Sequence, residues 1–196
     1  MGQTADVQAL IESHLPPYEH TLQLCETYFA QVSWLFRGVT RAQLIEEMIP
    51  AIYRRPGPVS PPHPSPQDSL NQDHGDVPEQ EDYSGPHDLA LLFMVLAIGS
   101  LVGPDPSNAW GEHFHQVGRA AVSLQPVLEK PSIVTIQTLH LMSIYNAMSG
   151  SDLRSDTSME MTWSLITLAA HLSQTIGLRQ FFFSWFIYLS LMLNCI

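Results

Sequence analysis

The sequence predicts an all-α fold, an irregular bundle of about six to seven helices. Three observations lead to this prediction. Apolar residues recur three and four positions apart in several segments, whereas alternation of apolar and polar residues nowhere lasts beyond about four residues. Prolines and glycines stand between these segments, where they begin or end helices. Apolar residues make up 45% of the 196 residues, which is enough for a sizeable core.

The N-terminal part, residues 1–55, is predicted to be helical. One helix begins near the proline pair at residues 16 and 17, which a first helical turn tolerates. Its apolar face is formed by Leu22, Tyr28, Phe29, Val32, Leu35 and Phe36. Thr40 offers an N-cap to a second helix, and Pro50 should kink that helix or end it early. The apolar side of this second helix consists of Leu44, Ile45, Met48, Ile52 and Tyr53.

Residues 56–86 differ from the rest of the chain in composition. They hold eight of the fifteen prolines and six acidic residues, but no lysine or arginine. So few apolar side chains remain that burial cannot offset the entropy of ordering the backbone. We therefore expect a disordered, acidic, proline-rich linker. A docking site at the PPHPSP motif of residues 61–66 is the alternative, since proline-rich segments bind partners in an extended conformation.

Residues 87–178 are predicted to form four further helices. The first is the nearly continuous apolar run Leu89–Val102, which is too short to cross a bilayer and fits a helix buried on most sides. Glycine and proline at residues 103, 104 and 106 end it. The second helix begins at Ser107 or Asn108 and closes at Pro126. Its apolar face consists of Trp110, Phe114, Val117, Ala121 and Leu124.

The last two helices of this region are predicted from the capping residues at their ends and from their stripes of apolar residues. The third helix follows Ser132, runs through Met148 and is capped by Gly150. The fourth begins near residues 155–157 and ends at Gly177. Its predicted core-facing stripe is formed by Met161, Leu165, Leu168, Leu172 and Ile176.

Residues 179–196 form a hydrophobic tail without a charged side chain after Arg179. As a helix, Phe181–Ile196 would be about 24 Å long, which is short of the ~30 Å hydrocarbon core of a bilayer. A membrane anchor is therefore the alternative to a core helix. A small helical membrane-associated protein, anchored by residues 181–196, is accordingly the second functional hypothesis.

The charge balance excludes several classes of function. The formal net charge is −11 and Lys130 is the sole lysine, whereas a surface that binds a phosphate backbone needs clustered lysine and arginine. Two cysteines, Cys25 and Cys195, can make neither a disulfide framework nor a four-cysteine zinc site. The first residues lack the basic start of a signal peptide, so we expect an intracellular protein.

No catalytic, cofactor-binding or metal-binding residue is predicted, and we expect a non-enzyme. The short motifs typical of hydrolases, nucleotide-binding proteins and zinc proteases are absent from the sequence. His113 and His115 would diverge by about 200° on a helix. Glu112 and His115 share a face, but they are a single copy of a pattern that di-iron bundles need twice. An enzyme of unrecognised class is the third hypothesis, and no residue supports it.

Several other polar residues are expected to be structural. His140 and His171 lie within apolar helices, where we expect hydrogen-bonded histidines in the core or at its boundary. Cys25 is expected to be a small buried residue. Glu46 and Glu47 point about 100° apart on a helix, so they do not form an acid–base pair.

Four segments resemble the fungal-specific transcription factor domain, the middle homology region of fungal zinc-cluster transcription factors. Residues 136–146, IQTLHLMSIYN, resemble its IQALxLMxxY helix. Residues 163–178, WSLITLAAHLSQTIGL, resemble its WxLxxxAxxLAQxIGLH helix. Leu89–Val102 resembles its opening helix, and residues 28–36 resemble its YFxxVxxxFP segment. The segments follow the family's order, and the resemblance covers residues 20–178.

The resemblance implies a regulatory part of a transcription factor that does not itself contact DNA. Such proteins act in the nucleus, in DNA-templated transcription by RNA polymerase II, and bind DNA through an N-terminal six-cysteine zinc cluster. That cluster is absent from this chain, so we expect it to bind neither zinc nor DNA and to carry no cofactor. Homodimers or heterodimers through exposed helical faces and a small-molecule effector are the partners that the resemblance implies.

The chain departs from the family pattern after Leu178. The family continues with an arginine-rich segment and an aromatic helix, whereas this chain reads Leu178-Arg179-Gln180 and then FFFSWF. We interpret residues 179–196 as non-family sequence, of the kind that a translated intron or a shifted reading frame produces, and the family domain, residues 87–178, as truncated. Truncation leaves apolar faces of the last two helices without partners, so we expect poor solubility or recruitment of a partner through those faces.

Overall fold

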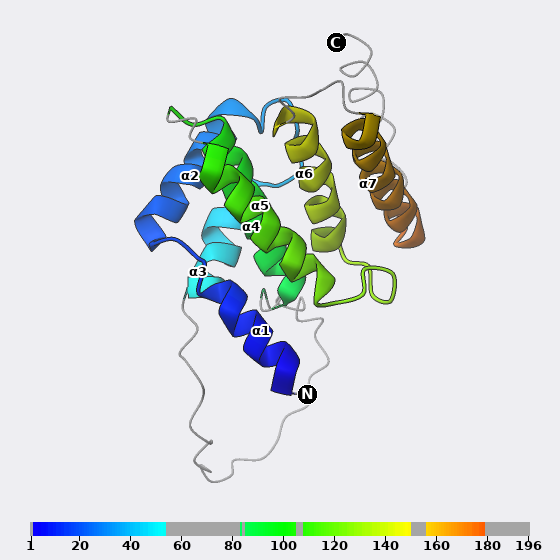
Figure 1. The fold of residues 1–196 in the computed structure, drawn as a ribbon, viewed down its shortest axis with the longest axis horizontal. Helices are drawn as coiled ribbons and strands as arrows, with labels where there is room; N and C mark the ends of the chain where they lie inside the picture. The colour runs from blue at the N-terminus through cyan, green and yellow to red at the C-terminus, as the bar shows by residue number, and fades with distance from the viewer. Residues whose placement is uncertain (1, 54–82, 84, 105–107, 150–155, 179–196) are drawn as a thin grey trace, which may run out of the picture.

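A computed structural model of the chain describes residues 2–53, 83, 85–104, 108–149 and 156–178. Within these ranges it contains seven α-helices, one π-helical segment and no strand, which confirms the predicted all-α class. The elements, shown in Figure 1, are α1 (Gly2–Glu12), α2 (Tyr18–Gln31), the π-helix η1 (Ala42–Met48), α3 (Ile49–Tyr53), α4 (Pro86–Leu101), α5 (Asn108–Ser123), α6 (Ile133–Ser149) and α7 (Asp156–Thr175).

Helix α4 is the centre of the bundle. It packs against α2, α5 and α6, and every side chain from Leu89 to Ile98 is buried. A helix that is apolar on all sides can be accommodated only where neighbours surround it, which explains the central position of this run. Helix α7 lies at the far edge of the bundle and packs chiefly on α6 (Figure 1). Helix α1 contacts α5.

The start of α4 is determined by three consecutive features of the sequence. Gly85 is the N-cap, Pro86 occupies the first turn, and the Asp88 carboxylate accepts a hydrogen bond from the Gly85 N–H at 2.8 Å. Tyr83, just upstream, is buried and donates a hydrogen bond to Glu47 at 2.7 Å. The folded part therefore begins before residue 87, the boundary expected from composition. Residues 54–82 and 84 of the predicted linker lie outside the described residues.

The N-terminal helices differ from the sequence prediction at the end of α2. This helix ends at Gln31, so Val32, whose side chain is buried as predicted, is its C-cap, and Leu35 and Phe36 lie beyond the helix. Phe36 is reached through a turn in which its N–H donates to Val32 O at 3.0 Å. The proline pair precedes α2 as expected, and Pro16 O accepts a hydrogen bond from the Tyr53 hydroxyl at 2.7 Å.

The segment after Thr40 is a π-helix that changes into an α-helix at Pro50. Thr40 Oγ1 accepts a hydrogen bond from the Gln43 N–H at 3.2 Å, as the predicted N-cap should. The Ile49 N–H still bonds five residues back, to Leu44 O, and Pro50 follows it with no N–H to offer. Pro50 does not end the helix, which continues to Tyr53. A proline is tolerated here because it lies in the first turn of α3.

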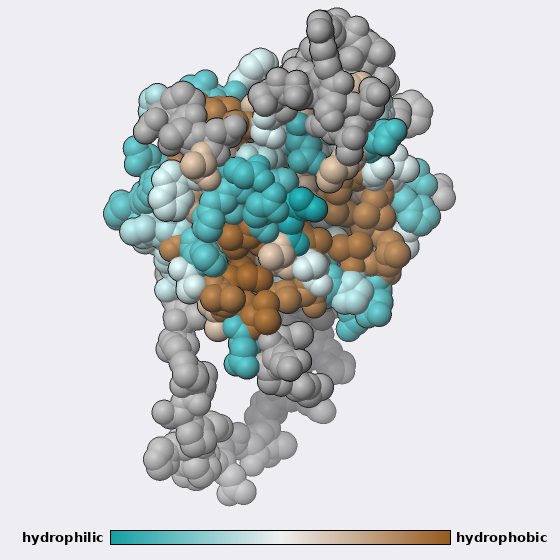
Figure 2. Space-filling model, viewed as in Figure 1, coloured by the Kyte–Doolittle hydropathy of each residue, from teal (hydrophilic) through white to brown (hydrophobic). Residues whose placement is uncertain are grey.

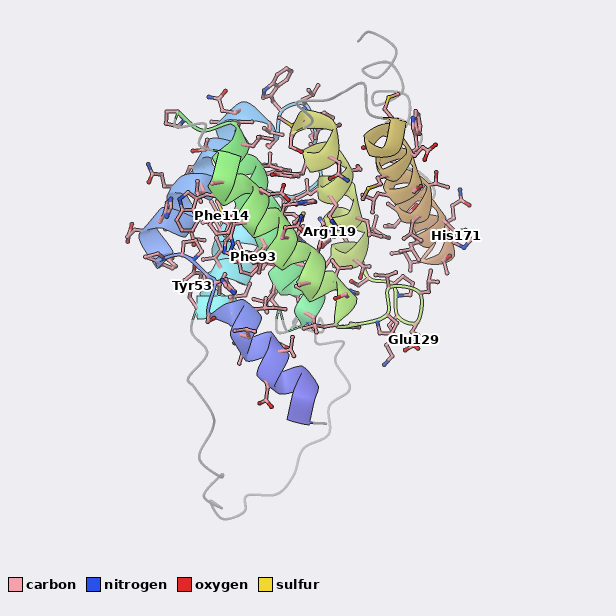
Figure 3. The ribbon with its side chains drawn as sticks, viewed as in Figure 1. Tyr53, Phe93, Phe114, Arg119, Glu129 and His171 are labelled. Atoms are coloured by element: carbon pink, nitrogen blue, oxygen red, sulfur yellow. The ribbon has the colours of Figure 1, made fainter. Side chains whose placement is uncertain are left out.

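Helix α5 buries most of its predicted apolar face, with one exception. Phe114, Val117 and Ala121 are buried, and the Phe114 ring lies near the Phe93 ring of α4 (Figure 3). Trp110 is 59% exposed, so its assignment to the core face was wrong. Its indole lies beside the outer side of Phe114, where it shields that ring from solvent.

Helix α6 begins with a reciprocal cap. The Ser132 hydroxyl accepts a hydrogen bond from the Thr135 N–H at 3.1 Å, and Thr135 Oγ1 accepts one from the Ser132 N–H at 3.3 Å. The predicted start after Ser132 is therefore confirmed. From Val134 to Tyr145 nearly the whole helix is buried between α4 and α7. Gly150, the predicted C-cap, lies outside the described residues.

Helix α7 buries a different face from the one predicted. Its buried residues are Thr162, Ile166, Ala169, Leu172 and Ser173. The predicted stripe lies roughly a quarter turn away around the helix, and only Leu172 belongs to both sets. Met161 is 42% exposed, and Leu165, Leu168 and Ile176 are half-buried at the edge of the core.

Candidate functional site

A polar cluster lies where α5 meets α6. The side chains of Glu112, His115 and Tyr145 form it: the imidazole of His115 stacks on the Tyr145 ring with centroids 4.3 Å apart. The Tyr145 hydroxyl donates to Glu112 Oε2 at 3.3 Å, and His115 Nδ1 lies 3.9 Å from the same oxygen. His115 and Tyr145 are buried, whereas Glu112 is at the surface. The cluster thus joins the buried helix interface to solvent through one carboxylate.

Burial controls the protonation of this cluster. Loss of water lowers the pKa of His115 to about 4, although the Glu112 carboxylate acts in the opposite direction. Burial, followed by the same carboxylate, raises the pKa of the Tyr145 hydroxyl. Both rings are therefore neutral at pH 7. A neutral imidazole stacked on a neutral phenol packs two helices together. The expected separation of His115 from His113 holds, since the His113 ring contacts His14, in the turn after α1.

The other histidines divide between core and surface. His140 is buried beside Gly38 and Phe36, and burial lowers its pKa to about 3. Its burial agrees with the expected position in the core. His171 is exposed on the side of α7 that faces away from α6, so its expected position in the core or at its boundary was wrong (Figure 3). His113 lies between His14, in the turn after α1, and Trp110, at ring-centroid distances of 5.1 and 5.9 Å.

Cys25 and Glu47 also have structural roles. Cys25 is fully buried in α2, and burial raises the pKa of its thiol to about 12, so the thiol is unreactive in the folded chain. The expectation of a small buried residue is confirmed. Glu47 accepts the Tyr83 hydrogen bond described above, which gives this carboxylate a structural role. Among the described residues no group of three or more His, Cys, Asp or Glu side chains could hold a metal ion.

The most distinctive exposed feature of the bundle is apolar. Figure 2 shows apolar side chains at the surface on the side of the molecule where α6 and α7 lie. We call the row of apolar residues Met161, Leu165, Leu168, Leu172 and Ile176 on α7 the outer stripe; Leu172 is its one buried member. The stripe is exposed at Met161 and half-buried along most of its length, so it offers a row of apolar side chains beside the α6 contact. Such a surface is typical of an interaction site.

Comparison with known families decides what kind of protein carries this bundle. The family model described as "Fungal specific transcription factor domain" matches residues 65–186. The chain belongs to this family. The match contains α4, α5, α6 and α7, and the two segments whose sequences resemble the family most closely form α6 and most of α7. Membership indicates a regulator of transcription rather than an enzyme.

The matched range differs from the expected extent of the resemblance at both ends. It begins at residue 65, within the predicted linker, so the resemblance at residues 28–36 lies outside it. It ends at residue 186, eight residues beyond Leu178, where we expected family sequence to stop. No curated protein matches the chain, and no solved structure does.

The residues present do not fit the family's zinc cluster. That cluster needs six cysteines, and the chain has two, of which Cys25 is buried in α2. None of the described helices is long and apolar enough to cross a membrane. Residues 181–196, on which the hypothesis of a membrane anchor rests, lie outside the described residues.

Proposed function

We propose that this chain is the regulatory, non-DNA-contacting portion of a fungal zinc-cluster transcription factor, and that it acts in the nucleus on transcription by RNA polymerase II. The observation that carries the proposal is the family match over residues 65–186, which coincides with four helices packed around one core. The role assigned to the chain is to present a folded surface to partners, and DNA contact belongs to a separate module.

The charge of the chain supports the assignment of DNA contact to a separate module. A chain with net charge −11 and eight basic residues repels a phosphate backbone. Arg41, one of these eight, forms an ion pair with Glu26, so its positive charge is already neutralised within the chain. A zinc-holding, DNA-binding module therefore has to come from elsewhere, and we assign no cofactor to this chain.

The outer stripe of α7 supports the proposed partners. An apolar row at the edge of a bundle favours association with another helical surface, either a second copy or a related chain. A homodimer or heterodimer through this face is accordingly part of the proposal. The proposal also includes a small-molecule effector, which is supported by family membership alone.

A reporter assay tests the proposal. The full chain is fused to an unrelated DNA-binding domain and expressed in fungal cells with a reporter that carries the matching operator. We expect reporter transcription to differ severalfold from that of the DNA-binding domain alone, and a fluorescent version of the fusion to lie in the nucleus. Equal reporter transcription at equal protein level would contradict the proposal.

A matched pair of variants distinguishes a folded regulatory surface from a nonspecific effect of the fused chain. Gly99→Val, which forces a side chain into the backbone of α2, should abolish the effect because it disrupts the bundle. Met159→Gln, at an exposed position of α7, should leave the effect unchanged. An effect that survives Gly99→Val does not come from the folded domain.

A further inference from the structure

We propose that His14 and His113 form a surface site for a divalent transition-metal ion, with Zn²⁺ as the best match to their geometry, and that the bound ion holds α1 on α5. The inference does not rest on the transcriptional role, and the pair shares no residue with a cysteine cluster. It departs from the expectation that the chain binds no metal. That expectation came from spacings within the sequence, whereas these two histidines are brought together only by the fold.

The two imidazoles are spaced like two ligands of one tetrahedral ion. Their ring centroids lie 5.1 Å apart. A zinc-bound imidazole nitrogen lies about 2.0–2.1 Å from the ion, which places the ring centre about 3.2 Å from it. Two such rings at the tetrahedral angle have centres about 5.2 Å apart. The observed spacing therefore matches that of two histidines that share one zinc ion.

The orientation of the rings also suits a shared ion. The planes of His14 and His113 meet at 64°, so an edge of one ring is turned toward the other. Ring edges carry the nitrogens, whereas a stacked pair such as His115 on Tyr145, with planes at 19°, presents ring faces. The second side-chain torsion of histidine is broad, so either imidazole can turn its nitrogens toward the ion at little cost.

The backbone already holds both side chains in place. His14 lies in the turn after α1, where its N–H donates to Ile11 O at 3.0 Å. Ile11 is buried on one side of this histidine, and Leu15 packs against the core on the other. His113 lies within α5, directly before the buried Phe114. Two ligands positioned by packed elements lose little freedom when they bind an ion.

The pair is accessible and has the donor atoms of a transition-metal site. His14 is exposed, and His113 is half-buried with Trp110 on its other side. Imidazole nitrogen suits Zn²⁺, Cu²⁺ and Ni²⁺, whereas Mg²⁺ and Ca²⁺ prefer oxygen ligands. Within the described part of the chain no third His, Cys, Asp or Glu completes the pair, so water would supply the remaining ligands. Two protein ligands make a reversible site, unlike the four of a structural zinc site.

Helix α1 is the element that such an ion would stabilise. Between residues 6 and 12 it buries only the side chain of Ile11, while Val7 and Leu10 are 41% and 61% exposed. The element that it contacts most is α5 (Figure 1). An ion that binds only the docked form shifts the equilibrium toward it, by about 100-fold at an ion concentration of 100 times the Kd. Zinc should therefore hold α1 on the bundle.

Binding is measured on the full chain without a histidine tag, after treatment with a chelator. Calorimetric titration with ZnCl2 should give one ion per chain, and zinc should raise the Tm, whereas MgCl2 should do neither. His14→Gln and His113→Gln should each weaken zinc binding by about tenfold or more, since even the loss of a group that orients a metal ligand costs that much. His171→Gln, at an exposed position of α7, is the matched control and should bind zinc like the unmodified chain.

Hydrogen exchange measured by mass spectrometry locates the effect of the ion. Zinc should slow exchange of the α1 amides severalfold in the unmodified chain and in His171→Gln, but not in His14→Gln. Far-UV circular dichroism establishes that each variant is folded, and His113→Asn replaces His113→Gln if that variant does not fold.

Three results would overturn the proposal. Absence of zinc binding, or binding that survives both His14→Gln and His113→Gln, would show that the two rings form an aromatic contact only. One ion per two chains, with a zinc-dependent dimer in size-exclusion chromatography, would place the site between two copies. Zinc binding that depends on both histidines but leaves exchange in α1 unchanged would refute the stabilisation of this helix.

Discussion

Gln43 and Gln137 exchange two side-chain hydrogen bonds across 94 residues of sequence. Gln43 Nε2 donates to Gln137 Oε1 at 2.8 Å, and Gln137 Nε2 donates back to Gln43 Oε1 at 2.9 Å. The pair joins the π-helix η1 to α6, so the N-terminal segment and the family domain are parts of one packed body. Each amide satisfies the other in a half-buried site, which makes the pair specific as well as stabilising.

The first prediction concerns this amide pair. Gln137→Leu should destabilise the chain by about 1–2 kcal/mol, because the Gln43 amide is left without its partner. The double variant with Gln43→Leu should cost less than the sum of the two single variants, with a coupling energy of about 1 kcal/mol. Urea unfolding of the four chains measures this cycle. Strict additivity would show that the two amides do not interact in solution.

The second prediction compares two glycines at helix contacts: Gly99 of α4, which faces α2, and Gly118 of α5, which faces α4. A Cβ on Gly99 would lie 2.3 Å from Leu24 O, a backbone atom of α2, so Gly99→Ala should destabilise by about 1–3 kcal/mol. A Cβ on Gly118 would meet Met94 Cε at 2.4 Å, the end of a flexible side chain that can move. Gly118→Ala should therefore cost clearly less, since alanine also favours the helix by about 1 kcal/mol. Thermal and urea unfolding decide the order, and an equal loss would refute this interpretation of the α2–α4 contact.

The third prediction is a loss of stability in mild acid that depends on His115. Its pKa is about 4 in the folded chain, below the ordinary value of 6.5. Between these values the unfolded chain binds a proton that the folded chain does not, so stability is full above about pH 6.5 and falls as the pH decreases toward 4. The slope from one such histidine reaches about 1.4 kcal/mol per pH unit.

Two variants isolate this contribution. His115→Phe keeps an aromatic ring on Tyr145 and removes the titration, so the unfolding free energy should change less between pH 7 and pH 5. His171→Gln, at an exposed position, should retain the slope of the unmodified chain. Part of the slope should remain in His115→Phe, because burial also lowers the pKa of His140, to about 3. An unchanged slope in His115→Phe would show that this ring is accessible to protons in the folded state.

The fourth prediction concerns Cys25. In a Cys195→Ser background, Cys25 should react with a thiol reagent only as fast as the chain unfolds, since a buried thiol with a pKa of about 12 offers no thiolate. Reaction in native buffer should be slow, and reaction in urea should be complete within the mixing time. Fast reaction in native buffer would place Cys25 at a surface.

Local features of the sequence determined several elements correctly. The cap at Ser132 and the N-cap at Thr40 were predicted because a hydroxyl before an apolar run satisfies the first N–H groups of the helix, whatever lies around it. The central position of Leu89–Ile98 was also predictable, because a helix without a polar face has to be surrounded. The family could be named from the segments that form α6 and α7, whose residue order survives in the sequence.

The tertiary structure alone decided which faces these helices bury. Apolar residues of α7 cover more than half of its circumference, so periodicity admits several orientations, and the position of α6 selects Thr162, Ile166 and Ala169 over the predicted stripe. Trp110 and His171 were misplaced for the same reason: an apolar neighbourhood in sequence does not determine which side of a helix receives a partner. Gln43 of η1 meets Gln137 of α6 only because the fold brings these two distant segments together. Local sequence determines where a helix begins and what it can bury, whereas the choice among its apolar faces is a property of the whole bundle.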